Sequence, residues 1–543
     1  MNRKGKIIVS VVGIFIILLA LVGITYGYFL TRIQGNTNTT SISVTTADLK
    51  LVYADGSPNI VADRIEPGET ISSKIFTVAN EGNATVENYN VYLENVINQI
   101  ELKDDVTYTL TCKEYTITDY NTNKSGATKL RDCNGASETV FPSVMSIIAT
   151  NTIAEGNIHV YEINVVYEDT DTDQSIDMNK TIDARINIYD SKIKFLANEI
   201  MTNVKKTGTF TYNKTTYIEP SLQDGIQYTI PAEEISSTNE RVMSYTFDDY
   251  GTSYYYRGNV EDNYVNFAGM CFRIVRIEGA GSVKLILEDQ YTECDDTPTN
   301  NKNNDNITYT GAWDIPASDG DTITMNGTEP YRTGNFGYDA ETYSGKQNIN
   351  YLNPVTESKR SMVNAFKYFQ KSNLNRYLDN LRSGNWCYND IAYSDAAGKN
   401  IINKEDYYRD SLYFYYDTYV RLFSSTEKNS SLKCNGTKLN YYNDNLNMYV
   451  SAITADELMY IGYAAQEENV TYLTSENNKS FWSFSFRWHD SWGDYTFLIP
   501  SYGLNVSYVG YNGFSFRPLV VLNSNITVKT GGVGTQTNPY VID

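Results

Sequence analysis

"PGETISSKIFTVANEGNATVENYNVYL", residues 67–93, is the stretch that decides the fold of the first half of the chain. A turn at Pro67-Gly68 leads into an apolar run, a second turn follows at Glu81-Gly82-Asn83, and another apolar run comes after it. Short apolar runs between clusters of Gly, Pro and Asn are typical of β-strands. This order predicts strands joined by tight turns.

Three further segments of the first half alternate apolar and polar residues. A period of two places every second side chain on one face of a strand, as expected for half-buried strands. The sequence therefore predicts a β-sandwich over residues 36–190. The alternating positions are Val106, Tyr108, Leu110 and Cys112, then Tyr161, Ile163, Val165 and Tyr167, and finally Ile182, Ala184, Ile186 and Ile188.

Composition limits the classes of function. The chain has 543 residues, which favours several domains. Its 44 Lys and Arg against 65 Asp and Glu give a net charge of −21, which repels phosphate backbones and excludes nucleic acid as an expected partner. Only two His, His159 and His489, are present, which leaves little for histidine-based catalysis or metal binding.

The N-terminus, residues 1–35, carries a basic tip and an apolar segment. No charge occurs from Ile7 to Leu30, a span long enough to cross a membrane. The basic residues before it predict a single-pass anchor in the cell membrane, with the bulk of the chain extracellular. A signal peptide is the alternative, because Thr25 and Gly27 suit a cleavage site, and cleavage after Gly27 yields a secreted protein.

Six cysteines agree with export. None forms a C-x-x-C pair, so zinc or thioredoxin-type motifs are not indicated. Fifteen connectivities are possible, and six free thiols are the alternative. We favour pairing between sequence neighbours, with about 3 kcal/mol of stabilisation from each loop. The expected disulfides are Cys112–Cys133, Cys271–Cys294 and Cys387–Cys434.

The residue pattern changes in the second half of the chain, where it predicts both helices and strands. Apolar positions predict a helix over 193–204, a polar connector up to residue 242, and a hairpin around the turn at 278–281. Residues 295–350 are rich in turn formers and predict long loops. A helix is expected from Ser361 to Ser383, and a short one after the capping box of Thr454 and Glu457.

The first half resembles a known group of proteins. The apolar segment ending "GITYGYFLTR", then "SISVTTADLKL" and the "PGE…FTVANEGN" block, are similar to exported β-sandwich proteins of Gram-positive bacteria, including camelysin and fibre-forming biofilm matrix proteins. The likeness covers residues 7–190. It implies an exported sandwich with possible self-association, and no protease motif accompanies it.

The second half resembles a different group. "YYYRGNVEDNYVNFAGMCFRIVRIEG", "ITADELMYIGYA", "GFSFRPLVVLNSNITV" and "GGVGTQTNPYVID" are similar to exported proteins of gut Firmicutes whose C-terminal halves resemble the C-type lectin-like superfamily, in the branch of formylglycine-generating enzyme and retroelement variable proteins. The resemblance implies an α+β lectin-like domain over 243–543. Within it, Arg517 is expected to tether a loop, and Pro518 requires a strand edge or a bulge.

Catalytic motifs are incomplete, so no enzyme activity and no cofactor are expected. No Cys lies between Gly436 and Asp543, where the copper-holding pair of formylglycine-generating enzyme would be sought. Ser430-x-x-Lys433 and Lys529-Thr530-Gly531 lack the Ser-Asp-Asn element of penicillin-binding enzymes. His489-Asp490 has no second His or positioned nucleophile nearby in the sequence.

One acidic loop is a weak calcium candidate. Asp169, Asp171 and Asp173 occupy alternate positions, and carboxylate oxygens suit Ca²⁺. The EF-hand pattern then requires Gly and Glu where this chain has Gln174 and Lys180. A solvated hairpin loop is the favoured interpretation, and no metal is expected.

The stretch Phe481–Pro518 is crowded with aromatic residues interrupted by Gly, Ser, Asn and Asp. Aromatic rings beside amides and carboxylates are typical of adaptable binding surfaces, and they also suit stacking on sugar rings. A purely structural role is the alternative. The candidate ligand-binding residues are Trp488, His489, Asp490, Trp492, Asp494, Tyr502, Asn505, Tyr508, Tyr511 and Asn512.

The sequence thus predicts an N-terminal transmembrane helix, an all-β sandwich and an α+β C-type lectin-like domain. The expected function is non-enzymatic recognition or adhesion at the cell surface through a glycan or protein ligand. A structural fibre or biofilm matrix subunit is the first alternative. An enzyme with an unrecognised site is the second.

Overall fold

The structure is a computed structural model of the chain. It describes residues 29–35, 41–43, 50–56, 60–62, 67–170, 172–203, 209–212, 215–218, 241–289, 293–295, 309–311, 323–325, 329–331, 366–367, 369–388, 391–396, 398–401, 413–424, 430–440, 446–463, 471–473, 481–490, 493–499, 505–508 and 514–542.

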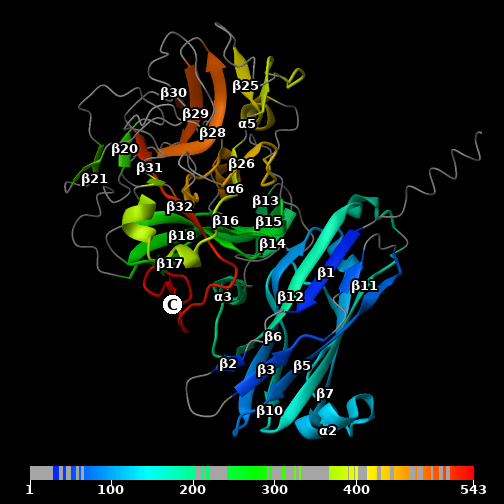
Figure 1. Ribbon diagram of the computed structural model, residues 1–543. Coiled ribbons are helices and arrows are strands. Elements are labelled where there is room, and N and C mark those ends of the chain that lie inside the picture. Colours follow the sequence, from blue (N-terminus) through cyan, green and yellow to red (C-terminus); the bar gives the residue numbers. More distant parts are fainter. Residues whose placement is uncertain are drawn as a thin grey trace, which may run out of the picture. The chain divides into compact units, whose positions relative to one another are not determined.

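The chain forms two compact units. Unit 1 takes in the chain up to Ile193 together with Gly279–Gly281, and unit 2 takes in Lys194–Glu278 and Ser282–Asp543. The two units are described separately (Figure 1).

Unit 1 consists of two sheets, as the predicted β-sandwich requires (Figure 1). One sheet has the order β10-β6-β12-β1-β4, and β1 joins β12 in parallel while its other pairings are antiparallel. The second has the order β2-β3-β5-β11-β7, and β7 also pairs with β8 and β9. The strands are β1 Phe29–Gly35, β2 Ser41–Ser43, β3 Lys50–Ala54, β4 Ile60–Ala62, β5 Thr70–Asn80, β6 Val86–Asn98, β7 Val106–Thr116, β8 Arg131–Asp132, β9 Ala136–Val140, β10 Ser146–Ile153, β11 Asn157–Tyr167 and β12 Lys180–Asp190.

The alternating positions of the sequence line the core of unit 1. All twelve of them belong to one cluster of buried residues, for example Val106, Tyr161, Ile163 and Ile182, each fully covered. Burying one large apolar side chain contributes roughly 1.5–3 kcal/mol, so this face dominates the stability of the unit. The predicted strand pattern is therefore confirmed here.

One helix interrupts the expected run of strands. Helix α2 spans Ile117–Asn123 and follows β7 directly. Thr116 caps it, because its side chain accepts a hydrogen bond from the backbone N–H of Asp119 at 3.3 Å. The expectation of strands alone was wrong at this point, since a Thr at the N-cap position favours a helical turn.

Unit 2 contains a sheet with the order β27-β32-β19-β18-β16-β15, and β17 pairs with both β18 and β33. The predicted hairpin is β18 and β19, paired antiparallel. Arg517 lies just before β32 and donates from Nε to the carbonyl of Leu287 at 2.6 Å and from a terminal nitrogen to that of Leu473 at 3.4 Å. The strands are β15 Arg241–Asp248, β16 Gly251–Gly258, β17 Tyr264–Phe267, β18 Met270–Ile277, β19 Val283–Asp289, β27 Val450–Ser451, β32 Leu519–Leu522 and β33 Tyr540–Val541.

A second sheet of unit 2 has the order β20-β31-β28-β25-β24, and β29 pairs with both β28 and β30. Three two-stranded sheets complete the described strands of the unit: the hairpins β13 with β14 and β21 with β22, and the antiparallel pair of β23 with β26, which are distant in sequence. The strands are β13 Thr209–Tyr212, β14 Thr215–Ile218, β20 Tyr309–Gly311, β21 Ile323–Met325, β22 Glu329–Tyr331, β23 Trp386–Tyr388, β24 Ala392–Tyr393, β25 Phe414–Tyr416, β26 Thr437–Leu439, β28 Phe481–Asp490, β29 Gly493–Ile499, β30 Asn505–Tyr508 and β31 Phe514–Phe516.

Short helices complete unit 2. Helix α3, Leu196–Asn203, and helix α6, Ala455–Ile461, lie where the sequence predicts them, and α6 has the expected capping box of Thr454 and Glu457. The single long helix expected from 361 to 383 is wrong for its second half. The described part passes into a π-helical turn at Gln370–Leu374 and a 3-10 turn at Leu378–Asn380.

No helix within the described ranges is long and apolar enough to span a membrane. The predicted anchor lies almost entirely outside these ranges, and its last two residues, Phe29 and Leu30, begin strand β1.

Candidate functional site

Strand register in unit 2 brings aromatic residues from four strands into one row. Tyr415 on β25 pairs with Trp488 on β28, Trp488 pairs with Tyr495 on β29, and Tyr495 pairs with Tyr508 on β30. Directly paired residues of antiparallel strands present their side chains on the same face. The sequence-predicted Trp488 therefore shares a face with Tyr415 and Tyr495, and the predicted Tyr508 occupies the next paired position, on β30.

A β-bulge on β28 adds a cation to this row. Phe486 pairs with Thr496 and Trp488 with Tyr495, so Arg487 is an extra residue on its strand. A bulge re-aims the side chain next to it. The guanidinium carbon of Arg487 consequently lies only 4.2 Å from the centre of the Trp488 ring.

A column of rings runs from the same row along α5, Asp417–Tyr419, and the π-helical turn Val420–Ser424. Tyr415, Tyr419 and Phe423 are four residues apart, a spacing that places side chains on one side of a helical segment. Tyr415 stacks on Tyr419 at 5.1 Å between ring centres, and Tyr419 on Phe423 at 6.0 Å. Phe423 in turn stacks on the buried Phe497 at 5.3 Å.

The column and the row positions Tyr415, Trp488 and Tyr495 form one continuous surface, called here the aromatic strip. Tyr413 is 47% exposed at its edge, and the other members are partly exposed. Its inner neighbours Phe414, Tyr416 and Phe486 are buried, so the strip is anchored in the core of the unit. The members of the aromatic strip are Tyr413, Tyr415, Tyr419, Phe423, Arg487, Trp488 and Tyr495.

Arg487 is the charged centre of the strip. Its guanidinium carbon lies 5.1 Å from the Tyr419 ring and 5.4 Å from the Phe423 ring, within the range of cation–π attraction. Burial lowers the pKa of Arg487 from its usual value. Arg487 Nε and Trp488 Nε1 have no hydrogen-bond partner in the described part of the chain. Two N–H donors therefore remain unused at the centre of the strip.

The other sequence-predicted ligand residues are placed only in part. His489 pairs with Asp494, Asp490 closes the β28–β29 pairing opposite Gly493, and Asn505 pairs with Leu498. Only the strand positions of these residues are described. The remaining four, Trp492, Tyr502, Tyr511 and Asn512, lie outside the described residues.

The sequence prediction missed the segment 413–423, "YFYYDTYVRLF", which supplies more than half of the strip. Its signal was present in the sequence. The aromatic residues at 415, 419 and 423 repeat every four positions, next to an alternating pair at 413 and 415. Arg487 left no such signal, because a bulge depends on the partner strand.

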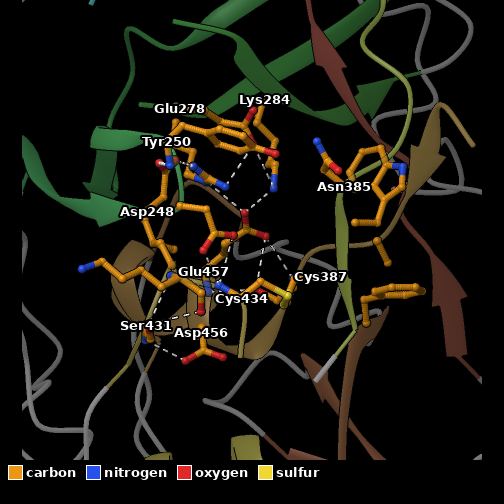
Figure 2. Close-up of a pocket in the computed structure, with 18 residues that line it drawn as sticks. Asp248, Tyr250, Glu278, Lys284, Asn385, Cys387, Ser431, Cys434, Asp456 and Glu457 are labelled. Carbon is orange, nitrogen blue, oxygen red and sulfur yellow. Dashed lines mark hydrogen bonds and ion pairs between the residues drawn. A yellow bond between two sulfur atoms is a disulfide. The ribbon is translucent and has the colours of Figure 1, made fainter. Parts of the chain in front are cut away.

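Unit 2 also holds a polar pocket, with an empty volume of about 580 Å³ including the part open to solvent (Figure 2). Its floor is a network of ion pairs around Arg276 on β18. The guanidinium of Arg276 pairs with Asp248 at 2.7 Å, with Glu278 at 3.1 Å and with Glu457 at 3.0 Å. All four side chains are buried.

Glu457 joins this network to helix α6. It receives Lys284 Nζ at 2.6 Å and completes the capping box by accepting from the backbone N–H of Thr454 at 3.1 Å. Burial by itself would raise the pKa of Glu457, but Lys284 and Arg276 outweigh it and lower the pKa to about 2. The carboxylate therefore stays ionised and fixed.

The neighbouring carboxylates of the pocket are also held. Arg421 forms a two-pronged pair with Asp456, at 2.6 and 2.9 Å, and reaches Asp417 with Nε at 2.6 Å. Asp249 pairs with Lys438 at 2.9 Å. Since each of these acids has a cationic partner, the floor of the pocket is a structural network of ion pairs.

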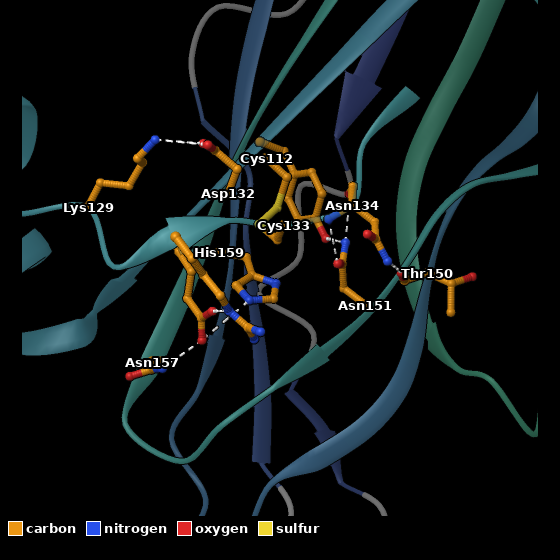
Figure 3. The surroundings of a disulfide bond; sticks show 12 residues. Cys112, Lys129, Asp132, Cys133, Asn134, Thr150, Asn151, Asn157 and His159 are labelled. Atoms are coloured by element: carbon orange, nitrogen blue, oxygen red, sulfur yellow. Dashed lines mark hydrogen bonds and ion pairs between the residues drawn. A yellow bond between two sulfur atoms is a disulfide. The ribbon is translucent and has the colours of Figure 1, made fainter. Parts of the chain in front are cut away.

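All six cysteines are paired, with the connectivity that sequence neighbours predict: Cys112–Cys133, Cys271–Cys294 and Cys387–Cys434. The third disulfide forms part of the pocket wall (Figure 2). The first lies beside the buried His159 of unit 1 (Figure 3).

The described part of the chain shows no cluster of ligands at the calcium candidate, Asp169, Asp171 and Asp173. Asp173 accepts a hydrogen bond from the backbone N–H of Ser175 at 3.0 Å, as in a solvent-facing turn. Asp171 lies outside the described residues. In the described part of the chain, the only group of three or more His, Cys, Asp or Glu placed closely enough for a metal ion is Cys112, Cys133 and His159.

No protein-family model matches the chain, and no curated protein matches it either.

Proposed function

We propose that the protein is a cell-surface recognition and adhesion protein, and that unit 2 binds a carbohydrate on the aromatic strip. The observation that carries this proposal is the row of paired positions Tyr415, Trp488, Tyr495 and Tyr508 across four neighbouring strands. Strands lie about 4.8 Å apart, so the row is about 14 Å long and accommodates more than one sugar ring.

The chemistry of the strip suits sugars. The C–H face of a pyranose packs on aromatic rings, and Trp488 and Tyr495 lie side by side with ring centres 5.2 Å apart. Arg487 contributes a positive charge within the strip, which suits the carboxylate of an acidic sugar or a hydroxyl oxygen. A contiguous, partly exposed apolar surface of this kind is typical of interaction sites.

The location at the cell surface is supported by independent features. Three disulfides are typical of an oxidising, exported environment. The apolar N-terminal segment from Ile7 to Leu30 suits export and anchoring. The proposed C-type lectin-like character of unit 2 rests on the sequence resemblance, together with the expected loop tether by Arg517.

The test is a glycan and mucin array probed with the purified full-length chain. A Trp488→Ala/Tyr495→Ala variant removes two neighbouring rings of the strip. Tyr115→Ala/Tyr120→Ala is the matched control, because it removes a partly exposed aromatic pair of unit 1 whose ring centres are 5.4 Å apart.

We expect the wild type and the control to bind the same glycans and the strip variant to lose at least ten-fold in affinity. A single stacking contact of 1.4 kcal/mol is sufficient for this change. Equal binding by the strip variant would move the site away from the strip. If the wild type binds no glycan or mucin on the array, the result would favour the alternative role as a fibre or matrix subunit.

A further inference from the structure

The inner face of unit 1 holds a group of residues that the proposed function does not use. Cys112 and Glu114 lie two residues apart on β7, and their partners on β11 are Tyr161 and His159. Residues two apart on a strand share a face, and paired residues do as well. All four side chains are therefore collected on the buried side of the sheet, and each is at least 95% covered.

Cys133 completes this group from the loop after β8. Its backbone N–H donates to the carbonyl of Cys112 at 3.1 Å, and its side chain is partly exposed. One ligand atom each from Cys112, Cys133 and His159 lie within 4.8 Å of one another (Figure 3). The residues that tetrahedral Zn²⁺ prefers are thus already gathered around a disulfide.

A chain of hydrogen bonds fixes the ring of His159. Its Nδ1 lies 2.6 Å from the hydroxyl of Tyr89, which lies 2.6 Å from the hydroxyl of Tyr161, and Asn151 donates to that hydroxyl at 2.8 Å. Metal-binding histidines are typically held in this way through the nitrogen that does not bind the metal.

Among the described residues, the other nitrogen of His159 makes no hydrogen bond and lies within ion-pair distance of Glu114 only. Nε2 is buried and has no hydrogen-bond partner in the described part of the chain. The nearest carboxylate oxygen, Glu114 Oε1, is 3.8 Å away, beyond hydrogen-bond distance, and it already accepts from Asn157 at 2.6 Å. A buried ring nitrogen without a hydrogen-bond partner lowers the stability of the fold. Such a group therefore points to a second state in which a ligand satisfies it.

We propose that reduction of Cys112–Cys133 converts this group into a binding site for a thiophilic d¹⁰ metal ion, with Cys112, Cys133 and His159 Nε2 as ligands. Zn²⁺ represents this class. Zinc–sulfur and zinc–nitrogen bonds of about 2.3 and 2.0 Å place tetrahedral ligands about 3.5–3.8 Å apart. One ring nitrogen of His159 and the two sulfurs already lie within 4.8 Å of one another, so small movements of the chain and a turn of the ring suffice once the sulfurs separate.

The chemistry balances with a dithiol as the reductant. The dithiol gives two electrons and two protons, becomes a cyclic disulfide itself, and leaves Cys112 and Cys133 as thiols. Metal binding then releases the two thiol protons to solvent, and both sulfurs bind as thiolates. The disulfide and the metal ion exclude each other, so oxidation of the site expels the ion.

The test uses the full-length chain, reduced with a dithiol, freed of reductant under argon and titrated with Co²⁺ as the spectroscopic substitute for Zn²⁺. The variants are Cys133→Ser and His159→Gln. The matched control is Cys294→Ser, because Cys271–Cys294 belongs to no such group in the described part of the chain.

We expect the reduced wild type and the Cys294→Ser variant to show a thiolate-to-cobalt charge-transfer band at one equivalent, which Zn²⁺ abolishes. The oxidised wild type should show none. Cys133→Ser should lose the band, and His159→Gln should weaken cobalt binding at least ten-fold. Circular dichroism of the reduced wild type shows whether its strands persist.

Three results would overturn the proposal. The first is a reduced wild type with free Cys112 and Cys133 thiols and no band. The second is a band that survives Cys133→Ser. The third is a reduced chain that loses its β-sheet signal together with metal binding. Cys112→Ser, which removes the other sulfur ligand, should lose the band as well and replaces Cys133→Ser where that variant fails to fold.

Discussion

At the scale of single residues, unit 2 depends on charges that are buried and paired. Arg276 contacts three carboxylates, and two of these also contact Lys284. Removing one partner of such a group leaves a charge in a dry environment without compensation. The loss of unfolding free energy on a single substitution is therefore larger than the net stabilisation that the ion pair itself provides.

Glu457→Gln is the sharpest test of this network. It keeps the shape of the side chain and leaves Lys284 and Arg276 one negative charge short. We expect unit 2 to lose about 3–5 kcal/mol of unfolding free energy, measured by chemical denaturation. Asp379→Asn, an exposed acid of the same unit, should change it by less than about 0.5 kcal/mol. Equal effects of the two variants would contradict the structural role of the network.

Asp177 of unit 1 gives a pH dependence of defined sign. Burial raises its pKa to about 6, although backbone N–H groups of Glu101 and Leu102 oppose the rise. Because the folded-state pKa lies above the unfolded value, the folded state takes up the proton first as the pH falls. The contribution of Asp177 to stability is complete below about pH 4 and is lost as the pH rises through 6.

The measurement is the unfolding free energy of unit 1 at pH 7 and pH 4.5, in the wild type and in Asp177→Asn. We expect the wild type to gain about 2 kcal/mol more than the variant on going to the lower pH. An identical pH dependence of both proteins would show that Asp177 titrates normally.

At the scale of elements, two helices with the same capping residue differ in what the cap supports. Thr454 caps α6, and every residue of that helix is buried. Thr116 caps α2, and no residue of that helix is buried. The same local interaction therefore stabilises a core element in one case and a surface turn in the other.

Thr454→Ala and Thr116→Ala compare these caps directly. We expect about 1–2 kcal/mol of destabilisation for Thr454→Ala, whose helix is buried, and about 0.5 kcal/mol for Thr116→Ala, whose helix has no buried residue. Denaturation followed separately for the two units measures both values. A larger loss of unfolding free energy for Thr116→Ala than for Thr454→Ala would contradict the view that the cap of the buried helix α6 matters more to stability.

The elements also show what the sequence can predict. Alternation at positions such as Tyr161 and Ile163 predicts the core of unit 1, because period two is a local property. The capping box at Thr454 predicts α6 for the same reason. Of the aromatic strip, only Trp488 was predicted. The row depends on which strands pair, and neither the Arg487 bulge nor the contact with Tyr419 is local in sequence.

At the scale of the whole molecule, each disulfide lies within one unit. Cys112–Cys133 belongs to unit 1, and Cys271–Cys294 and Cys387–Cys434 belong to unit 2. Each cross-link therefore acts on the unfolding of its own unit, and substitutions at cysteines report on the two units separately.

Cys387→Ser/Cys434→Ser should lower the stability of unit 2 by about 4 kcal/mol, because the disulfide closes a loop of 47 residues. Unit 1 should unfold as in the wild type. Differential scanning calorimetry with unit-specific proteolysis checks both statements. A matching loss in unit 1 would show that the two units unfold as one.

The parallel pairing of β1 with β12 has a consequence for folding of the chain during its synthesis. Phe29 pairs with Lys180, so the first strand is synthesised about 150 residues before its partner. At roughly 5–20 residues per second, β1 waits about 8–30 s for β12 to be made. Through that interval the side of β1 that pairs with β12 is an open sheet edge, available to chaperones and to neighbouring nascent chains. The timing of translation, rather than any contact in the finished fold, sets how long this risk lasts.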